Sequence, residues 1–107
     1  MTLELYEKTL ERWAQEEKEK AAEAKQAGDE RQHSIHLMKA SMLGDMLRVL
    51  GKLELSGRKG TLERIALQQA AEAERLKKIG DYDAAERSEI KAETVRRAMR
   101  LIENGDE

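Results

Sequence analysis

The chain contains no cysteine, no proline and no phenylalanine among its 107 residues. The absence of cysteine excludes disulfides, thiolate metal sites and cysteine nucleophiles. Aromatic residues make up only 3% of the chain, so a hydrophobic core must be built from Leu, Ile, Val, Met and Ala. Strands favour aromatic and β-branched residues, whereas Ala, Glu, Lys, Arg and Leu, which dominate here, are strong helix formers. The composition therefore predicts an all-α protein.

Long apolar runs and an excess of one charge are also missing. No apolar stretch approaches the ~20 residues that a membrane-spanning helix needs, and the early charges of the N-terminus do not fit a secretory signal. We therefore expect a cytoplasmic protein with no membrane partner. The 20 basic and 22 acidic residues give a net charge of −2. Proteins that bind nucleic acid usually carry a basic excess, so this balance argues against nucleic acid as the main partner.

Two glycine–aspartate pairs, Gly28-Asp29 and Gly80-Asp81, divide the chain into helical segments. Glycine ends a helix in the left-handed conformation, and aspartate caps the start of the next helix. Between the pairs lies a glycine-rich stretch, residues 51–60, which we interpret as a linker, with Thr61 as the N-cap behind it. The four predicted helices comprise residues 3–27, 30–50, 61–79 and 82–103.

The two glycine–aspartate pairs are 52 residues apart, and this spacing indicates an internal repeat. When the sequence is shifted by 52 residues, apolar residues fall on apolar residues almost throughout, as when Leu10 falls on Leu62. We therefore predict two tandem αα-hairpins, packed as a bundle or as stacked hairpins. The predicted single helical domain covers residues 1–107, with hairpins at 3–50 and 61–103.

The second helix of each predicted hairpin carries two apolar stripes at helical spacing. One stripe closes its own hairpin, and the other needs cover from the second hairpin, from a second copy or from a partner protein. Methionine ridges adapt to varied partners, but methionine also fills gaps in a core that is poor in aromatics. Partner surface, homodimer interface and internal core therefore all stay open. The predicted interface residues are Ile35, Met38, Met42, Met46, Val49, Ile90, Ala98 and Leu101.

The sequence around the second turn resembles a tetratricopeptide repeat. A Gly-Asp-Tyr turn at residues 80–82 precedes small residues at Ala85 and Ala92, as in the turn and second helix of that family. The pair at 28–29 follows the pattern less closely, because His33 stands where the first small residue belongs. The 52-residue period differs from the family's 34, and the family's first-helix aromatic residues and closing proline are absent. The resemblance implies a helical hairpin that binds a peptide or a protein.

Candidate metal and catalytic residues are few. His33 and His36 share a helix face with Asp29, and His with carboxylate can bind zinc. Since Asp29 already serves as a cap, we favour partly exposed polar histidines beside the turn, with metal binding left open. The charged segment Glu16–Lys20 is predicted to be solvated on most sides. With no nucleophile-elbow motif and no carboxylate pair inside an apolar stripe, we predict a non-enzymatic protein without catalytic, cofactor-binding or metal residues.

The last predicted helix is locally basic. Its basic residues either complement the helix dipole or form a patch for an acidic partner. Our leading hypothesis for the whole chain is a protein–protein interaction module that uses the Met/Ile helix face. The alternative is a small regulator or inhibitor, of a kind that phages and mobile elements encode, which blocks a nucleic-acid enzyme or another protein through its charged surface. The patch comprises Arg87, Lys91, Arg96, Arg97 and Arg100.

Overall fold

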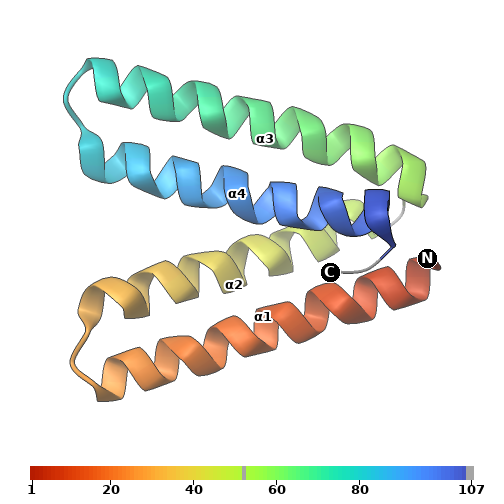
Figure 1. The fold of residues 1–107 in the computed structure, drawn as a ribbon, viewed down its shortest axis with the longest axis horizontal. Coiled ribbons are helices and arrows are strands. Elements are labelled where there is room, and N and C mark those ends of the chain that lie inside the picture. The colour runs from red at the N-terminus through yellow and green to blue at the C-terminus, as the bar shows by residue number, and fades with distance from the viewer. Residues whose placement is uncertain (52, 106–107) are drawn as a thin grey trace. The chain divides into compact units, whose positions relative to one another are not determined.

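The computed structural model describes residues 1–51 and 53–105, and within these ranges it contains four α-helices and no strand. Helix α1 packs against α2, and α3 packs against α4, so the chain forms two tandem hairpins (Figure 1). The two hairpins are separate compact units, Met1–Lys52 and Leu53–Glu107. The predicted all-α fold and its two hairpins are confirmed. The helices are α1 (Leu3–Gln26), α2 (Glu30–Leu50), α3 (Leu55–Lys78) and α4 (Tyr82–Asn104).

The two hairpin turns have the same geometry. Gly28 and Gly80 adopt φ values of 76° and 82°, the left-handed region that favours glycine. The N–H groups of Asp29 and Asp81 donate to the carbonyl five residues earlier, at 2.9 Å in both turns. Each aspartate carboxylate then accepts the backbone N–H three residues later, at 3.1 and 3.2 Å. Each turn therefore ends one helix and caps the next, as predicted.

The predicted linker at residues 51–60 is wrong over most of its length. Helix α3 begins at Leu55, so Gly57 and Gly60 lie inside the helix. Thr61 is consequently not an N-cap, and Glu54 occupies that position without a side-chain hydrogen bond.

The internal repeat explains why α3 begins early. Helix α1 comprises Leu3–Gln26, and a shift of 52 residues gives 55–78, the bounds of α3. Arg58, which the linker prediction placed in a loop, is fully buried, and its Nε donates to the Leu53 carbonyl at 2.8 Å. Burial of this turn outweighs the low helix propensity of its glycines.

Small residues let the helices of each hairpin approach closely. Ala40 in α2 and Ala92 in α4 occupy corresponding positions of the repeat, and both are buried. Ala21 in α1 and Ala73 in α3 correspond in the same way and are each 1% exposed. Aliphatic side chains fill the remaining core at Leu10, Leu43, Leu50, Leu62, Leu76 and Val95.

Alanine substitutions at two glycines of hairpin 2 should have opposite effects. Gly80→Ala is expected to lower the free energy of unfolding by about 1 kcal/mol, because an L-residue is strained in the left-handed region. Gly60→Ala should raise it by about 0.5–1 kcal/mol, since a Cβ there meets nothing within 4 Å. Urea unfolding followed by circular dichroism measures both. A neutral or destabilising Gly60→Ala would contradict the placement of Gly60 inside α3.

Candidate interaction surface

The face of α2 that closes hairpin 1 is identified by its bonds to α1. The Nδ1 atom of His33 lies 2.8 Å from the Ala21 carbonyl oxygen, and the Nδ1 atom of His36 lies 2.6 Å from Oε2 of Glu17. Helical spacing places Ala40, Leu43 and Leu50 on this same side. All three are at most 5% exposed. One of the two predicted stripes of α2 therefore packs against α1.

The other stripe of α2 is rotated from the first by about 130°. Ile35, Met38 and Met42 are half-buried, and Val49 is 61% exposed. Met46 differs, because only 2% of it is exposed. Val49 is therefore the well exposed residue of this apolar stripe, and Ile35, Met38 and Met42 are partly accessible beside it.

The predicted interface residues of hairpin 2 are less accessible. Ile90 is half-buried, whereas Ala98 and Leu101 are 0% and 1% exposed. Like Met46 in hairpin 1, these two residues of hairpin 2 are buried. The structure thus divides the predicted interface into a buried part and an accessible part, and the accessible part is concentrated on α2.

The predicted histidine site is used for packing between helices. Asp29 caps α2, and both histidines hydrogen-bond to α1 rather than to a common point. Among residues 1–51 and 53–105, no group of three or more His, Cys, Asp or Glu could hold a metal ion. The two histidines therefore hold α2 against α1.

Glu17 is the site residue that the sequence prediction missed. The segment Glu16–Lys20 was expected to be solvated, but Glu17 is only 4% exposed. Its carboxylate and the His36 ring, which is 18% exposed, form a pair between the two helices. The helical spacing of α1 could have predicted this burial. Glu17 lies four residues after Trp13 and four before Ala21, on the buried stripe of the helix.

The basic residues of α4 do not form one patch. Helical geometry places Arg87 and Lys91 on the opposite side of α4 from Arg96 and Arg100. Both of the latter side chains pair with Glu93, at 3.8 and 2.9 Å. Arg97 is half-buried. The predicted acidic-partner patch is therefore split, and part of its charge is balanced by an acidic residue of the same helix.

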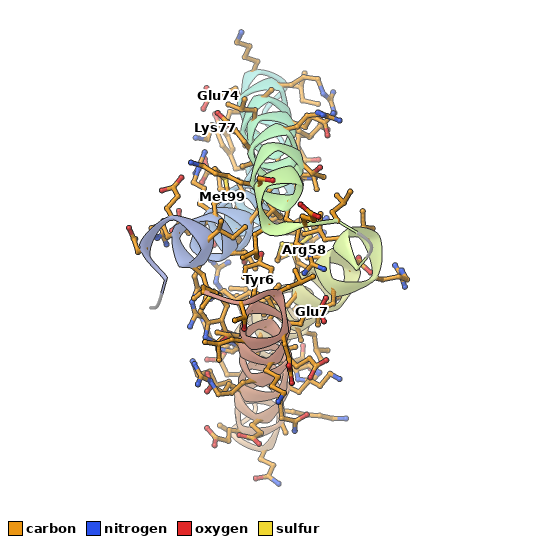
Figure 2. All side chains as sticks on the ribbon, turned by 90° about the vertical axis from the view of Figure 1, so that its right-hand side faces the viewer. Tyr6, Glu7, Arg58, Glu74, Lys77 and Met99 are labelled. Carbon is orange, nitrogen blue, oxygen red and sulfur yellow. The ribbon has the colours of Figure 1, made fainter. Side chains whose placement is uncertain are left out.

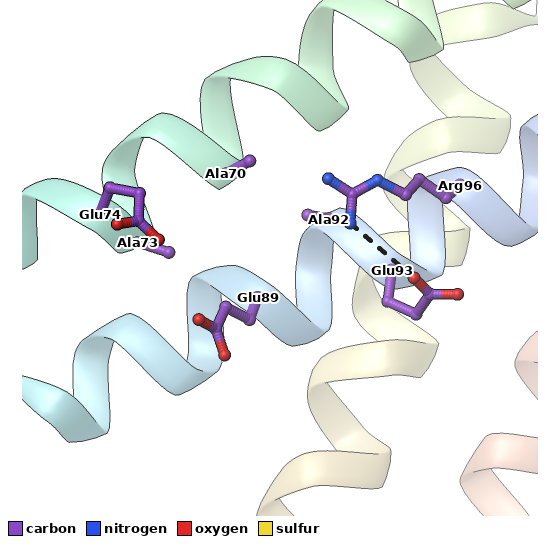
Figure 3. Close-up of a pocket in the computed structure, with 7 residues that line it drawn as sticks. All are labelled: Ala70, Ala73, Glu74, Glu89, Ala92, Glu93 and Arg96. Carbon is purple, nitrogen blue, oxygen red and sulfur yellow. Dashed lines mark ion pairs between the residues drawn. The ribbon is translucent and has the colours of Figure 1, made fainter. Parts of the chain in front are cut away.

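A groove of about 420 Å³ lies between α3 and α4 (Figure 3). Alanines line its floor, and charged side chains surround it. The floor residues are Ala70, Ala73 and Ala92, and the charged residues are Glu74, Glu89, Glu93 and Arg96.

The acidic residues of this groove already have basic partners within hairpin 2. Lys77 pairs with Glu89 across the two helices and with Glu74 at 3.5 Å along α3; Figure 2 shows Glu74 and Lys77 together. The hydrogen bond to Glu89 is the main reason that the pKa of Lys77 is raised. Glu93 pairs with the two arginines of α4. The groove is therefore bordered by internal ion pairs, which makes it a weaker candidate for ligand binding than the apolar stripe of α2.

No protein-family model, no curated protein and no solved structure matches this chain. Among the described residues, no helix is long and apolar enough to cross a membrane. The function must therefore be argued from the surface of the molecule itself.

Proposed function

We propose that this chain is a non-enzymatic protein–protein interaction module that binds through the accessible apolar stripe of α2. We name this surface the α2 ridge and define it as Ile35, Met38, Met42 and Val49. The observation that carries the proposal is that this apolar face stays partly accessible: Ile35, Met38 and Met42 are half-buried and Val49 is 61% exposed. Apolar residues that are grouped on one face, rather than scattered singly, are typical of interaction sites.

The hairpin supports the ridge by holding α2 in a fixed orientation. The other side of α2 packs against α1. His33 and His36 form hydrogen bonds with α1, and aliphatic side chains such as Leu43 are buried on this side. A helix held in this way loses little conformational freedom when it binds, so more of the contact energy is available for affinity. Two flexible methionines at its centre allow the surface to fit partners of different shape.

The resemblance to a tetratricopeptide repeat supports the same proposal. Its two small residues, Ala85 and Ala92, are each 1% exposed, which is consistent with close contact between helices. Helical hairpins of this type are interaction scaffolds, so protein binding is the function that the resemblance favours.

Catalysis is a weaker interpretation of the same structure. The buried carboxylate of Glu17 and its histidine partner are the groups closest to an acid–base pair. The carboxylate side chain is only 6% exposed, however, and lies against α2. A general base must come within hydrogen-bond reach of its substrate, and this position leaves a substrate little access.

A photo-crosslinking side chain at Met42 tests the proposal. We expect it to crosslink a protein partner in cells of the source organism, while the same side chain at the exposed Leu67 of α3 does not. The captured protein is then purified and titrated against the wild-type chain and Met42→Glu. The glutamate should weaken binding at least about tenfold, because it places a charge within an apolar contact.

Charge reversal at Arg96 and Arg100 separates this proposal from the regulator alternative. Under the ridge proposal the double reversal should change affinity for the purified partner by less than about threefold, since both arginines lie on α4 and not on the ridge. If the reversal weakens binding and Met42→Glu does not, the charged surface is the binding site and the ridge proposal is wrong.

A further inference from the structure

The α2 ridge is part of a longer seam with the spacing of a coiled coil. Residues at alternating intervals of four and three run from residue 31 to residue 49, and such residues share one side of a helix. They span about 27 Å of α2. Apolar residues occupy four of the six positions, and opposite charges occupy the other two. We call these six residues the α2 seam: Arg31, Ile35, Met38, Met42, Asp45 and Val49.

The two charges of the α2 seam lie on either side of its centre. The midpoint of the seam falls between Met38 and Met42, and Arg31 precedes it while Asp45 follows it. Both charged residues are exposed. Asp45 accepts a hydrogen bond from Arg48 at 2.7 Å. Both side chains are exposed, and such a surface ion pair contributes so little free energy that Asp45 can pair with another cation instead.

The corresponding residues of hairpin 2 lack this pattern. Three of the six positions on α4 carry charge, and a fourth carries a hydroxyl, so no apolar seam is formed. Because the two hairpins otherwise repeat closely, the difference points to a role that only hairpin 1 performs. The residues are Asp83, Arg87, Ile90, Thr94, Arg97 and Leu101.

We infer that a second copy of this chain binds to the α2 seam, with the two α2 helices antiparallel about a two-fold axis. The inference rests on the proposed function and names the partner of that surface. An antiparallel pair centred between Met38 and Met42 brings Arg31 of each protomer within about one turn of Asp45 of the other. The two-fold axis makes this contact twice. A parallel pair would instead bring like charges together, which is unfavourable.

Charge exchange between the two seam positions tests the antiparallel dimer. Sedimentation equilibrium at low salt, over a hundredfold range of concentration, should show a dimer for the wild type. Arg31→Asp and Asp45→Arg should each weaken dimerisation about tenfold, since each single change creates two like-charge contacts. The double variant should regain the wild-type affinity. An equimolar mixture of the two single variants should form mixed dimers, because their charges are complementary.

Two controls accompany this experiment. Circular dichroism checks that each variant keeps its helix content, which Arg31→Asp should retain because an acidic residue is favourable near a helix N-terminus. Asp83→Arg makes the matched change at the corresponding position of α4 and should leave the dimer unaffected. A wild-type monomer at every concentration would overturn the inference. So would single variants that dimerise normally, or a double variant weaker than either single.

The outcomes also separate this inference from the proposed function. If the chain is monomeric but a purified partner protein binds in a manner that depends on Met42, the dimer is wrong and the interaction module stands. If Met42→Glu changes neither the solution mass nor partner binding, both fail.

Discussion

His36→Ala is expected to lower the free energy of unfolding by about 3 kcal/mol. The His36 ring lies 2.6 Å from the carboxylate of Glu17, whose side chain is 6% exposed. Alanine removes this partner and leaves the carboxylate buried without it. Leaving a buried polar group without its hydrogen-bond partner costs about 1–3 kcal/mol, and the high end applies because the Glu17 side chain is almost fully buried. Urea unfolding followed by circular dichroism measures the loss.

The repeat supplies a matched control for this variant. Hairpin 2 carries Gln69 and Ser88 at the positions that correspond to Glu17 and His36. Ser88 is buried and Gln69 is half-buried, so hairpin 2 folds with neutral residues at both positions. The double variant Glu17→Gln with His36→Ser should therefore stay within about 1 kcal/mol of the wild type. A loss below about 0.5 kcal/mol for His36→Ala would show that the pair contributes little.

The bounds of the helices could be predicted where two independent sequence signals agreed. Both hairpin turns combine a glycine with an aspartate cap, and both lie where the repeat requires them. At the start of α3 the two signals disagreed. Two glycines suggested a loop, whereas the 52-residue repeat made Leu55 correspond to Leu3, the first residue of α1. The repeat was the better guide, since a helix propensity penalty of about 1 kcal/mol per glycine is smaller than the gain from burying a helical turn.

The Glu17–His36 pair shows why the polar part of the site was harder to predict. The two residues are 19 positions apart and lie on different helices. Periodicity within α1 places Glu17 on the buried stripe, but it gives no information about the residue opposite. The expectation of a solvated segment averaged over five charged residues, whereas burial is decided separately for each position on the helix.

The division of the second stripe of α2 could be predicted from the sequence in direction but not in degree. Met42 and Met46 are one helical turn apart on the same side, yet Met42 is half-buried and Met46 is 2% exposed. Positions four apart differ by about 40° around the helix, so Met46 lies nearer than Met42 to the stripe that packs against α1. How completely each residue is covered depends on the packing around its turn, which periodicity does not give.

Leu62→Ala should lower the free energy of unfolding by about 3 kcal/mol. Leu62 lies on α3 and is fully buried, with a fractional exposure of 0%. Truncation removes its buried methyl groups and leaves a cavity, and such changes cost about 2–5 kcal/mol. The middle of that range is expected here because close-packed α-helices relax only partly around a cavity. Urea unfolding monitored by circular dichroism gives the loss directly.

Leu67→Ala is the matched control, since it makes the same chemical change five residues further along the same helix. Leu67 is 64% exposed, so its truncation should change the free energy of unfolding by less than about 0.5 kcal/mol. The difference between the two variants then measures burial alone, because alanine raises helix propensity slightly and equally at both positions. Similar losses at Leu62 and Leu67 would contradict the burial of Leu62 and the exposure of Leu67.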